Sequence, residues 1–203
     1  MRWEAFARRF AGTAVLSRPL MEAACGEPKE ILAVQLSRWT HAGRLVKLAR
    51  GRYLLPEPWA PAPPPAFVAN EMVYPSYVSL AYALQFYDLI PEGVSLVTSV
   101  TPGRPRTIET TVGVFRYRHI QQDIFWGSVS AVSEGHSIRI ASPEKAVLDF
   151  FYFETGPFSS ERFESYRFQN LDRIDLKRLK RYAGRMADDR LIRAANWVHK
   201  AAG

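Results

Sequence analysis

The most regular pattern of apolar and polar positions lies between Pro28 and Gly43. Leu32, Leu36 and Trp39 stand at i, i+4 and i+7, which is the spacing of one apolar face of an α-helix. A proline suits the first helical turn, where no backbone N–H is needed, and a glycine often follows the last turn. The pattern therefore predicts a helix that begins at Pro28 and ends before Gly43.

A different pattern follows this helix. Short apolar runs at 45–48 and 53–55 flank a turn made by Ala49, Arg50 and Gly51. Two short apolar segments separated by a glycine-containing turn are typical of a β-hairpin. We therefore predict a helix that leads directly into a hairpin.

The residues before this helix predict a compact helical unit. Apolar residues at helical spacing favour a helix over Trp3–Phe10, and residues 13–16 favour a short strand. Ser17 is a suitable N-cap for a helix over Arg18–Ala24, and Cys25-Gly26 makes the next turn. Helix, strand, helix, turn, helix and hairpin is the order of a winged helix-turn-helix. Its expected core residues are Phe6, Phe10, Val15, Leu20, Leu32, Leu36, Trp39, Leu45 and Tyr53.

A proline-rich segment follows the hairpin. Six of the ten residues from Pro56 to Pro65 are proline, which disfavours helix and central strand and favours an extended, semi-rigid linker. A docking motif for a proline-reading partner is the alternative interpretation. The linker, about 56–65, predicts two domains, 1–58 and 59–203.

The second domain is predicted to combine a small sheet with helices. Helical spacing predicts a helix over Tyr74–Leu89, and a cap at Ser142, Pro143 and Glu144 predicts another that ends near Phe153 and covers the sheet. Short β-rich runs predict an antiparallel or mixed sheet with strands at 95–100, 108–112, 114–120, 129–132 and 137–140. From Phe158 the chain is expected to be helical. The expected fold class is α+β, with a winged helix-turn-helix joined by a linker to a mixed α/β domain and a basic helical tail.

Basic and polar side chains concentrate on the predicted helix and hairpin. The face opposite the apolar stripe of the helix carries Val34, Ser37, Arg38 and His41. A recognition helix reads base edges from its polar face, whereas basic wing residues neutralise phosphates. A basic helix-hairpin packed on another domain, with its charges in solvent, is the alternative. The expected DNA-binding residues are Lys29, Ser37, Arg38, His41, Arg44, Lys47, Arg50 and Arg52.

The distribution of charge supports contact with a polyanion. The net charge is +5 over residues 1–58, −3 over 59–158 and +5 over 159–203. The basic tail contains a run with five Lys/Arg among nine residues and no acid. It could be a solvated helix surface or a second contact surface for nucleic acid or an acidic protein. This second basic surface would comprise Lys177, Arg178, Lys180, Arg181 and Arg185.

The residues that usually carry catalysis or bind metals do not form a recognisable motif. Cys25 is the only cysteine, so neither an internal disulfide nor a cysteine zinc site can form. The four histidines are scattered, and no glycine-rich phosphate loop is present. Glu144 and Lys145 are adjacent, which is the wrong spacing for a nuclease motif, and nothing distinguishes Asp123 or Glu109. We therefore expect no catalytic residues, no metal and no cofactor, and we expect that the protein is not an enzyme.

The apolar segments also bear on the cellular location. The longest uncharged run, Met72–Tyr87, is too short and too polar to span a membrane, and the charged N-terminus does not fit a signal peptide. The expected location is the cytoplasm, without membrane contact.

Several segments, taken in order, resemble the AbiEi family of antitoxins from type IV toxin–antitoxin systems of abortive infection. They are YVSLAYAL at 77–84, GVSLVTSVT at 93–101, TTVGVFRYRHI at 110–120 and ASPEKAVLD at 141–149. The helix and hairpin also match, with Trp39 where a smaller aliphatic residue is more usual. The resemblance implies a winged helix that binds inverted repeats in double-stranded DNA of its own promoter and represses it. It also implies a C-terminal domain that counters a nucleotidyltransferase-like toxin.

Two other functions remain open from the sequence. The chain could be a transcription regulator without a toxin partner, whose C-terminal domain senses a ligand or dimerises. It could also be a nucleic-acid or protein modifying enzyme, with Glu144 or Asp123 in its site.

Overall fold

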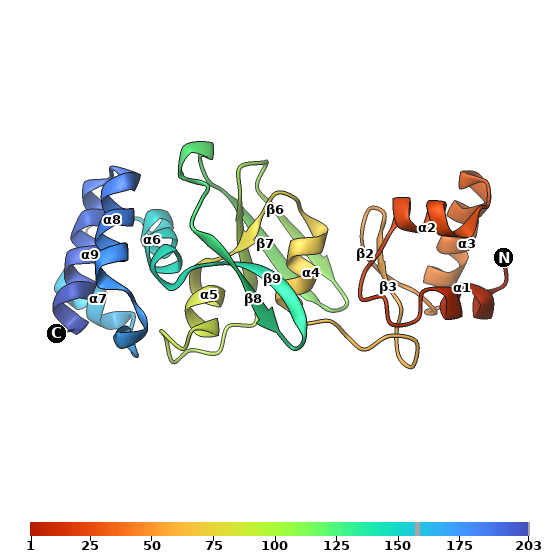
Figure 1. The fold of residues 1–203 in the computed structure, drawn as a ribbon, viewed down its shortest axis with the longest axis horizontal. Helices are drawn as coiled ribbons and strands as arrows, with labels where there is room; N and C mark the ends of the chain where they lie inside the picture. The colour runs from red at the N-terminus through yellow and green to blue at the C-terminus, as the bar shows by residue number, and fades with distance from the viewer. Residues whose placement is uncertain (157–158, 203) are drawn as a thin grey trace.

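The computed structural model describes residues 1–156 and 159–202, and its fold is α+β (Figure 1). The helices are α1 Trp3–Arg9, α2 Arg18–Cys25, α3 Lys29–His41, α4 Pro65–Met72, α5 Leu80–Phe86, α6 Pro143–Phe153, α7 Ser160–Ser165, α8 Leu176–Met186 and α9 Asp189–Ala202, with 3-10 turns η1 Gln122–Ile124 and η2 Leu171–Arg173. The strands are β1 Leu16–Ser17, β2 Val46–Ala49, β3 Arg52–Leu54, β4 Tyr77–Val78, β5 Val97–Thr101, β6 Arg106–Thr110, β7 Gly113–His119, β8 Ser128–Ser133 and β9 His136–Ala141. The N-terminal helices and the C-terminal helices lie at opposite ends of an elongated molecule, with the larger sheet between them (Figure 1).

The N-terminal unit has the predicted order of elements. Strands β1, β3 and β2 form a small antiparallel sheet in that spatial order. The core prediction is wrong at two positions, because Leu16 and Met21 are buried in place of Val15 and Leu20. Leu20 is 42% exposed, since it occupies the outer side of α2, while Met21 points into the N-terminal core. The predicted core residues that are buried are Phe6, Phe10, Leu32, Leu36, Trp39 and Leu45, and Tyr53 is half-buried.

The hairpin of β2 and β3 has two buried faces. Strand residues alternate between faces, so Leu48 and Leu54 point away from the helices that Tyr53 contacts. Leu48 and Leu54 belong to the core of the second unit. The hairpin therefore packs between the N-terminal helices and the larger sheet.

The proline-rich segment is not, over its whole length, the extended, semi-rigid linker that its composition predicts. The backbone N–H of Gly12 donates to the carbonyl of Trp59 at 2.9 Å, and the Trp59 ring packs edge-on against Trp3. Ala60 is buried in the N-terminal core, and α4 already begins at Pro65. Proline is compatible with a first helical turn, so prolines at 64 and 65 begin a helix here and do not extend the linker.

The larger sheet is mixed and has the spatial order β6-β7-β5-β4-β9-β8 among the described residues. The five strands predicted in this region are confirmed, with ends shifted by one or two residues. The helix predicted over Tyr74–Leu89 is wrong in its first part, because Tyr77–Val78 forms the central strand β4 and α5 begins at Leu80. A two-residue strand is too short to leave a periodic signal, and pairing with β5 and β9 determines it.

Helices cover both faces of this sheet. Tyr117 on one face donates its hydroxyl to the Ala69 carbonyl of α4 at 2.8 Å, and Tyr77 on the other donates to Asp149 of α6 at 3.1 Å. Helices α8 and α9 pack on α6 at the far end of the molecule (Figure 1). The predicted basic helical tail is confirmed from α7 onward, while its predicted start, Phe158, lies outside the described residues.

Candidate nucleic-acid interface

Helix α3 presents the polar face that its sequence predicts. Leu32, Leu36 and Trp39 are buried beneath it, whereas Ser37 and Arg38 are exposed on the opposite side. A left-handed conformation at Gly26, with φ of 65°, ends α2 and redirects the chain into α3. The exposed face of α3 is therefore free to meet another molecule.

A shallow hollow brings this helix and the hairpin together. Its volume is about 220 Å³, and residues of α3 and β2 line it jointly, including Ser37, His41 and Lys47. The Nδ1 atom of His41 lies 2.8 Å from the Ser37 carbonyl oxygen, which can only accept, so Nδ1 donates and Nε2 is left for another partner. The hollow is thus lined by two helix residues and one strand residue that the sequence assigned to DNA binding.

The remaining predicted basic residues differ in their surroundings. Arg44 and Arg50 are exposed at the two ends of β2. Lys29 is also exposed, and its Nζ lies 3.7 Å from a carboxylate oxygen of Glu22. A hydrogen bond from Arg18, together with Lys29, lowers the pKa of Glu22, so this carboxylate remains charged beside α3. Lys29 therefore carries a partly balanced charge, whereas Arg44 and Arg50 do not.

Arg52 does not join this set. It lies on the hairpin face that points toward the second unit, and its Nε donates to the Glu71 carbonyl oxygen at 3.0 Å. It lines a separate hollow of about 360 Å³ with Tyr74 and Arg139, away from α3. The sequence could not show that Arg52 lies on the other face of the hairpin from Lys47, because apolar residues occur on both faces and leave no single polar side.

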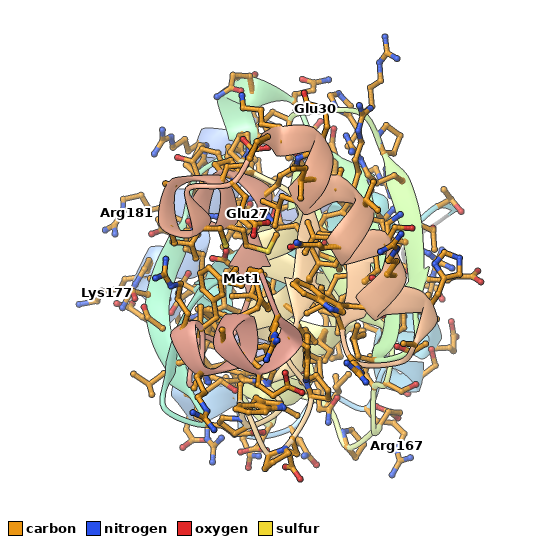
Figure 2. All side chains as sticks on the ribbon, turned by 90° about the vertical axis from the view of Figure 1, so that its right-hand side faces the viewer. Met1, Glu27, Glu30, Arg167, Lys177 and Arg181 are labelled. Carbon is orange, nitrogen blue, oxygen red and sulfur yellow. The ribbon has the colours of Figure 1, made fainter. Side chains whose placement is uncertain are left out.

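Exposed apolar side chains on α3 were not part of the prediction. Ile31 and Val34 are each 50% exposed, and with Arg38 they line a surface depression of about 310 Å³. Apolar side chains on a recognition helix can contact thymine methyl groups in the major groove. Glu30, on the outer edge of the same helix (Figure 2), would be repelled by phosphates and marks the limit of this face.

A buried polar cluster under α6 is the main feature that sequence reasoning missed. Lys145 and Asp149 form an ion pair one helical turn apart, and both side chains are fully buried. Asp149 also accepts hydrogen bonds from Ser79 at 2.7 Å and from Tyr77 at 3.1 Å. Burial raises the pKa of Asp149 and of Tyr77, and the Lys145 ammonium opposes the rise at Asp149. The i, i+4 spacing of lysine and aspartate was the available sequence signal.

Glu144 belongs to the same region and connects α6 to α8. It is 1% exposed, accepts from Ser142 at 2.8 Å and from the backbone N–H of Asp175 at 3.0 Å, and lies 3.7 Å from Arg178 Nε. These partners satisfy both carboxylate oxygens. The arrangement fixes the helix pair and leaves Glu144 no access to a substrate.

The contact between Arg178 and Glu144 removes Arg178 from the exposed part of the second basic surface on α8. Lys177, Lys180 and Arg181 are exposed, and Lys177 and Arg181 project from the same side of the molecule (Figure 2). Arg178 is half-buried by its contacts with Glu144 and Asp175, and the Arg185 guanidinium lies 4.2 Å from the Trp126 ring centroid. Helix α8 lies at the opposite end of the molecule from α3 (Figure 1).

The described residues were also compared with the requirements of a metal site, a membrane-spanning helix and a catalytic Asp123. Within residues 1–156 and 159–202, no group of three or more His, Cys, Asp or Glu side chains could hold a metal ion. In the same ranges, no helix is long and apolar enough to cross a membrane. Asp123 is exposed, and its backbone carbonyl accepts from Trp126 Nε1 at 3.0 Å.

Neither a protein-family model nor a curated protein matches this chain.

Proposed function

We propose that the protein is a DNA-binding transcription regulator that uses α3 and the β2–β3 hairpin as a winged helix. The hollow shared by Ser37, His41 and Lys47 carries this proposal, because it brings helix and hairpin residues to one surface. Their exposure, together with the charge of +5 on residues 1–58, favours a polyanionic partner.

The residues take different roles on the DNA. Ser37, Arg38 and His41 lie on the helix face that would enter the major groove, where hydroxyl, guanidinium and imidazole groups can bond to base edges. Lys47 and Arg50 lie on the hairpin and would contact phosphates, which positions the protein without reading sequence. Ile31 and Val34 extend the helix face with apolar contact.

Binding of the full chain to its own upstream DNA tests this proposal. The variant Arg38→Ala/Lys47→Ala/Arg50→Ala should lose binding in a fluorescence anisotropy titration. A matched control, Arg167→Ala/Arg193→Ala/Lys200→Ala, removes the same charge from exposed positions near the other end of the molecule and should retain it. Equal affinity of the first variant and the wild type would remove the site assignment.

We further propose that the protein represses its own promoter at inverted repeats and acts as an AbiEi-type antitoxin against a nucleotidyltransferase-like toxin. The ordered segments at 77–84, 93–101, 110–120 and 141–149 support this role. They include Tyr77, Ser79, Lys145 and Asp149, whose side chains meet in the buried cluster.

Growth experiments separate the two activities. Co-expression of the full chain with a nucleotidyltransferase-like protein encoded beside it should restore growth, and the DNA-binding variant should restore it equally. Failure of the wild type to restore growth, with promoter repression intact, would favour a regulator without a toxin partner.

No observation favours the enzyme alternative. Glu144 is enclosed by its hydrogen-bond partners, and Asp123 lies on the surface, apart from the buried cluster.

A further inference from the structure

Most of the positively charged residues of the middle segment lie on or next to two neighbouring strands. Residues 59–158 contain six Lys/Arg, and four of them lie in or just before the paired strands β6 and β7. These four are Arg104, Arg106, Arg116 and Arg118. The other two are engaged elsewhere, Lys145 with Asp149 and Arg139 over the Tyr74 ring. A segment with a net charge of −3 therefore has a local basic surface.

This basic surface is hollowed. A groove of about 660 Å³ is lined by Arg106, Thr107, Arg116, Arg118, His119 and Phe153, and lies between the outer strands and the end of α6. Arg116 and Arg118 are two residues apart on β7, so their side chains leave the same face about 7 Å apart along the strand. Thr107 is the cross-strand partner of Arg116 and adds a hydroxyl group to that face, whereas Arg106 is paired with Tyr117 and its side chain leaves the opposite face at the edge of the groove.

The arginines of β6 and β7 have no carboxylate partner in an ion pair among the described residues. The Arg118 guanidinium lies 4.2 Å from the Phe153 ring centroid, and Arg106 Nε bonds to the Arg104 carbonyl at 3.5 Å. Among the described residues, no acidic side chain forms an ion pair with Arg104, Arg106, Arg116 or Arg118. Clustered like charges repel one another, so a bound anion would stabilise this region.

We propose that this groove binds a small anion with adjacent phosphate groups, such as a nucleoside triphosphate or inorganic tripolyphosphate. Guanidinium groups bond phosphates through two parallel N–H donors, and two such groups on one strand face can hold neighbouring phosphates. The groove volume lies within the range of about 300–1,000 Å³ that is common for small-molecule sites.

A compact ligand fits better than a nucleic-acid strand. Arg116 and Arg118 lie toward one end of the β6–β7 pair, and the exposed Glu109 follows Thr107 on the same face toward the other end. A phosphate backbone that continued along the strands would meet this carboxylate. The site is independent of the proposed DNA contact, because none of its residues belongs to α3 or the hairpin.

Isothermal titration of the full chain tests the site with defined probes. Tripolyphosphate, ATP, GTP, a nucleoside monophosphate and a short single-stranded oligonucleotide are titrated separately at one salt concentration. We expect tripolyphosphate and the triphosphates to bind and the monophosphate to bind more weakly. Equal affinities for tripolyphosphate and the nucleotides would identify the phosphate chain as the ligand, and tighter nucleotide binding would add a base contact.

The variants assign this binding to the groove. Arg116→Ala/Arg118→Ala should weaken tripolyphosphate binding by about tenfold or more, because two charge-assisted contacts are lost. The charge-matched control Arg167→Ala/Arg193→Ala should bind as the wild type does, and unchanged circular dichroism spectra should show that both variants are folded. No binding of tripolyphosphate, or equal losses in the two variants, would overturn the proposal. Tighter binding of the oligonucleotide, lost in the groove variant, would also overturn it in favour of a nucleic-acid surface.

Discussion

The side chain of Arg52 donates from Nε to the backbone carbonyl oxygen of Glu71 at 3.0 Å and so ties β3 to the end of α4. Leu48 and Leu54 of the same hairpin are buried in the core of the second unit. A wing usually projects freely, but this hairpin is fixed between two packed layers. Its basic tip at Arg50 is therefore held in a defined position relative to both units.

The first prediction distinguishes the structural role of Arg52 from the DNA-binding role proposed for Arg50, which lies across the turn from it. Arg52→Ala should leave DNA affinity within about twofold of the wild type and lower the free energy of unfolding by about 1 kcal/mol, since it removes one half-buried hydrogen bond. Arg50→Ala should weaken DNA binding with little effect on stability. Anisotropy titrations and urea denaturation measure the two effects, and a loss of DNA affinity in Arg52→Ala alone would reverse the assignment.

A salt titration provides the second prediction. If Lys47 contacts a phosphate, Lys47→Ala should reduce the slope of log affinity against log salt by about one. It should also weaken binding by a similar factor for specific and unrelated sequences, because phosphates carry no sequence information. Arg38→Ala should instead reduce the preference for the specific sequence. Identical behaviour of the two variants would contradict the proposed division between helix and hairpin.

The third prediction concerns the ion pair of Lys145 and Asp149. Lys145→Met leaves a fully buried carboxylate without its cation, so the free energy of unfolding should fall by about 3–5 kcal/mol. The double variant Lys145→Met/Asp149→Leu should be less destabilised than the single one, because it removes the uncompensated charge. Urea denaturation followed by circular dichroism measures both variants. Equal losses of stability in the two variants would mean that the packing of the two side chains, and not the unpaired charge of Asp149, determines the effect.

Much of the fold could be predicted from local patterns. The α3 stripe of Leu32, Leu36 and Trp39 and the cap at Ser142 each specify a helix within a few residues, and the structure has both helices. In the middle sheet, the strand predicted at 114–120 is β7, in which the buried Phe115 and Tyr117 alternate with exposed residues. These signals are strong because burial on one face repeats with a fixed period.

The rest depended on tertiary packing. Strand β4 is only Tyr77–Val78 and exists because β5 and β9 pair with it. The burial of Lys145 and Asp149 needs Tyr77 and Ser79 from a distant segment, so local sequence patterns did not indicate it. The groove at β6 and β7 likewise required the strand register, because the arginines at 104–106 and 116–118 are separated in sequence.

The last prediction follows from the half-buried Tyr87, which donates its hydroxyl to the Ala141 carbonyl at 2.9 Å. Burial, with the Glu144 carboxylate as the second cause, raises the pKa of Tyr87 to about 12. The ordinary value in an unfolded chain is about 10. Between these values the unfolded chain loses the proton while the folded protein keeps it, so this contribution to stability is complete below about pH 10 and is lost as the pH rises to about 12.

Tyr87→Phe should therefore show a shallower loss of stability than the wild type over this alkaline range, although it is less stable at neutral pH because the Ala141 carbonyl loses its donor. Urea denaturation at several pH values between about 10 and 12, the range between the unfolded and folded pKa values of Tyr87, gives the two slopes. Tyr74→Phe is the matched control, since Tyr74 is 79% exposed and should leave the slope unchanged. Parallel slopes for wild type and Tyr87→Phe would show that the Tyr87 hydroxyl is not shielded by the contact between α5 and the end of β9.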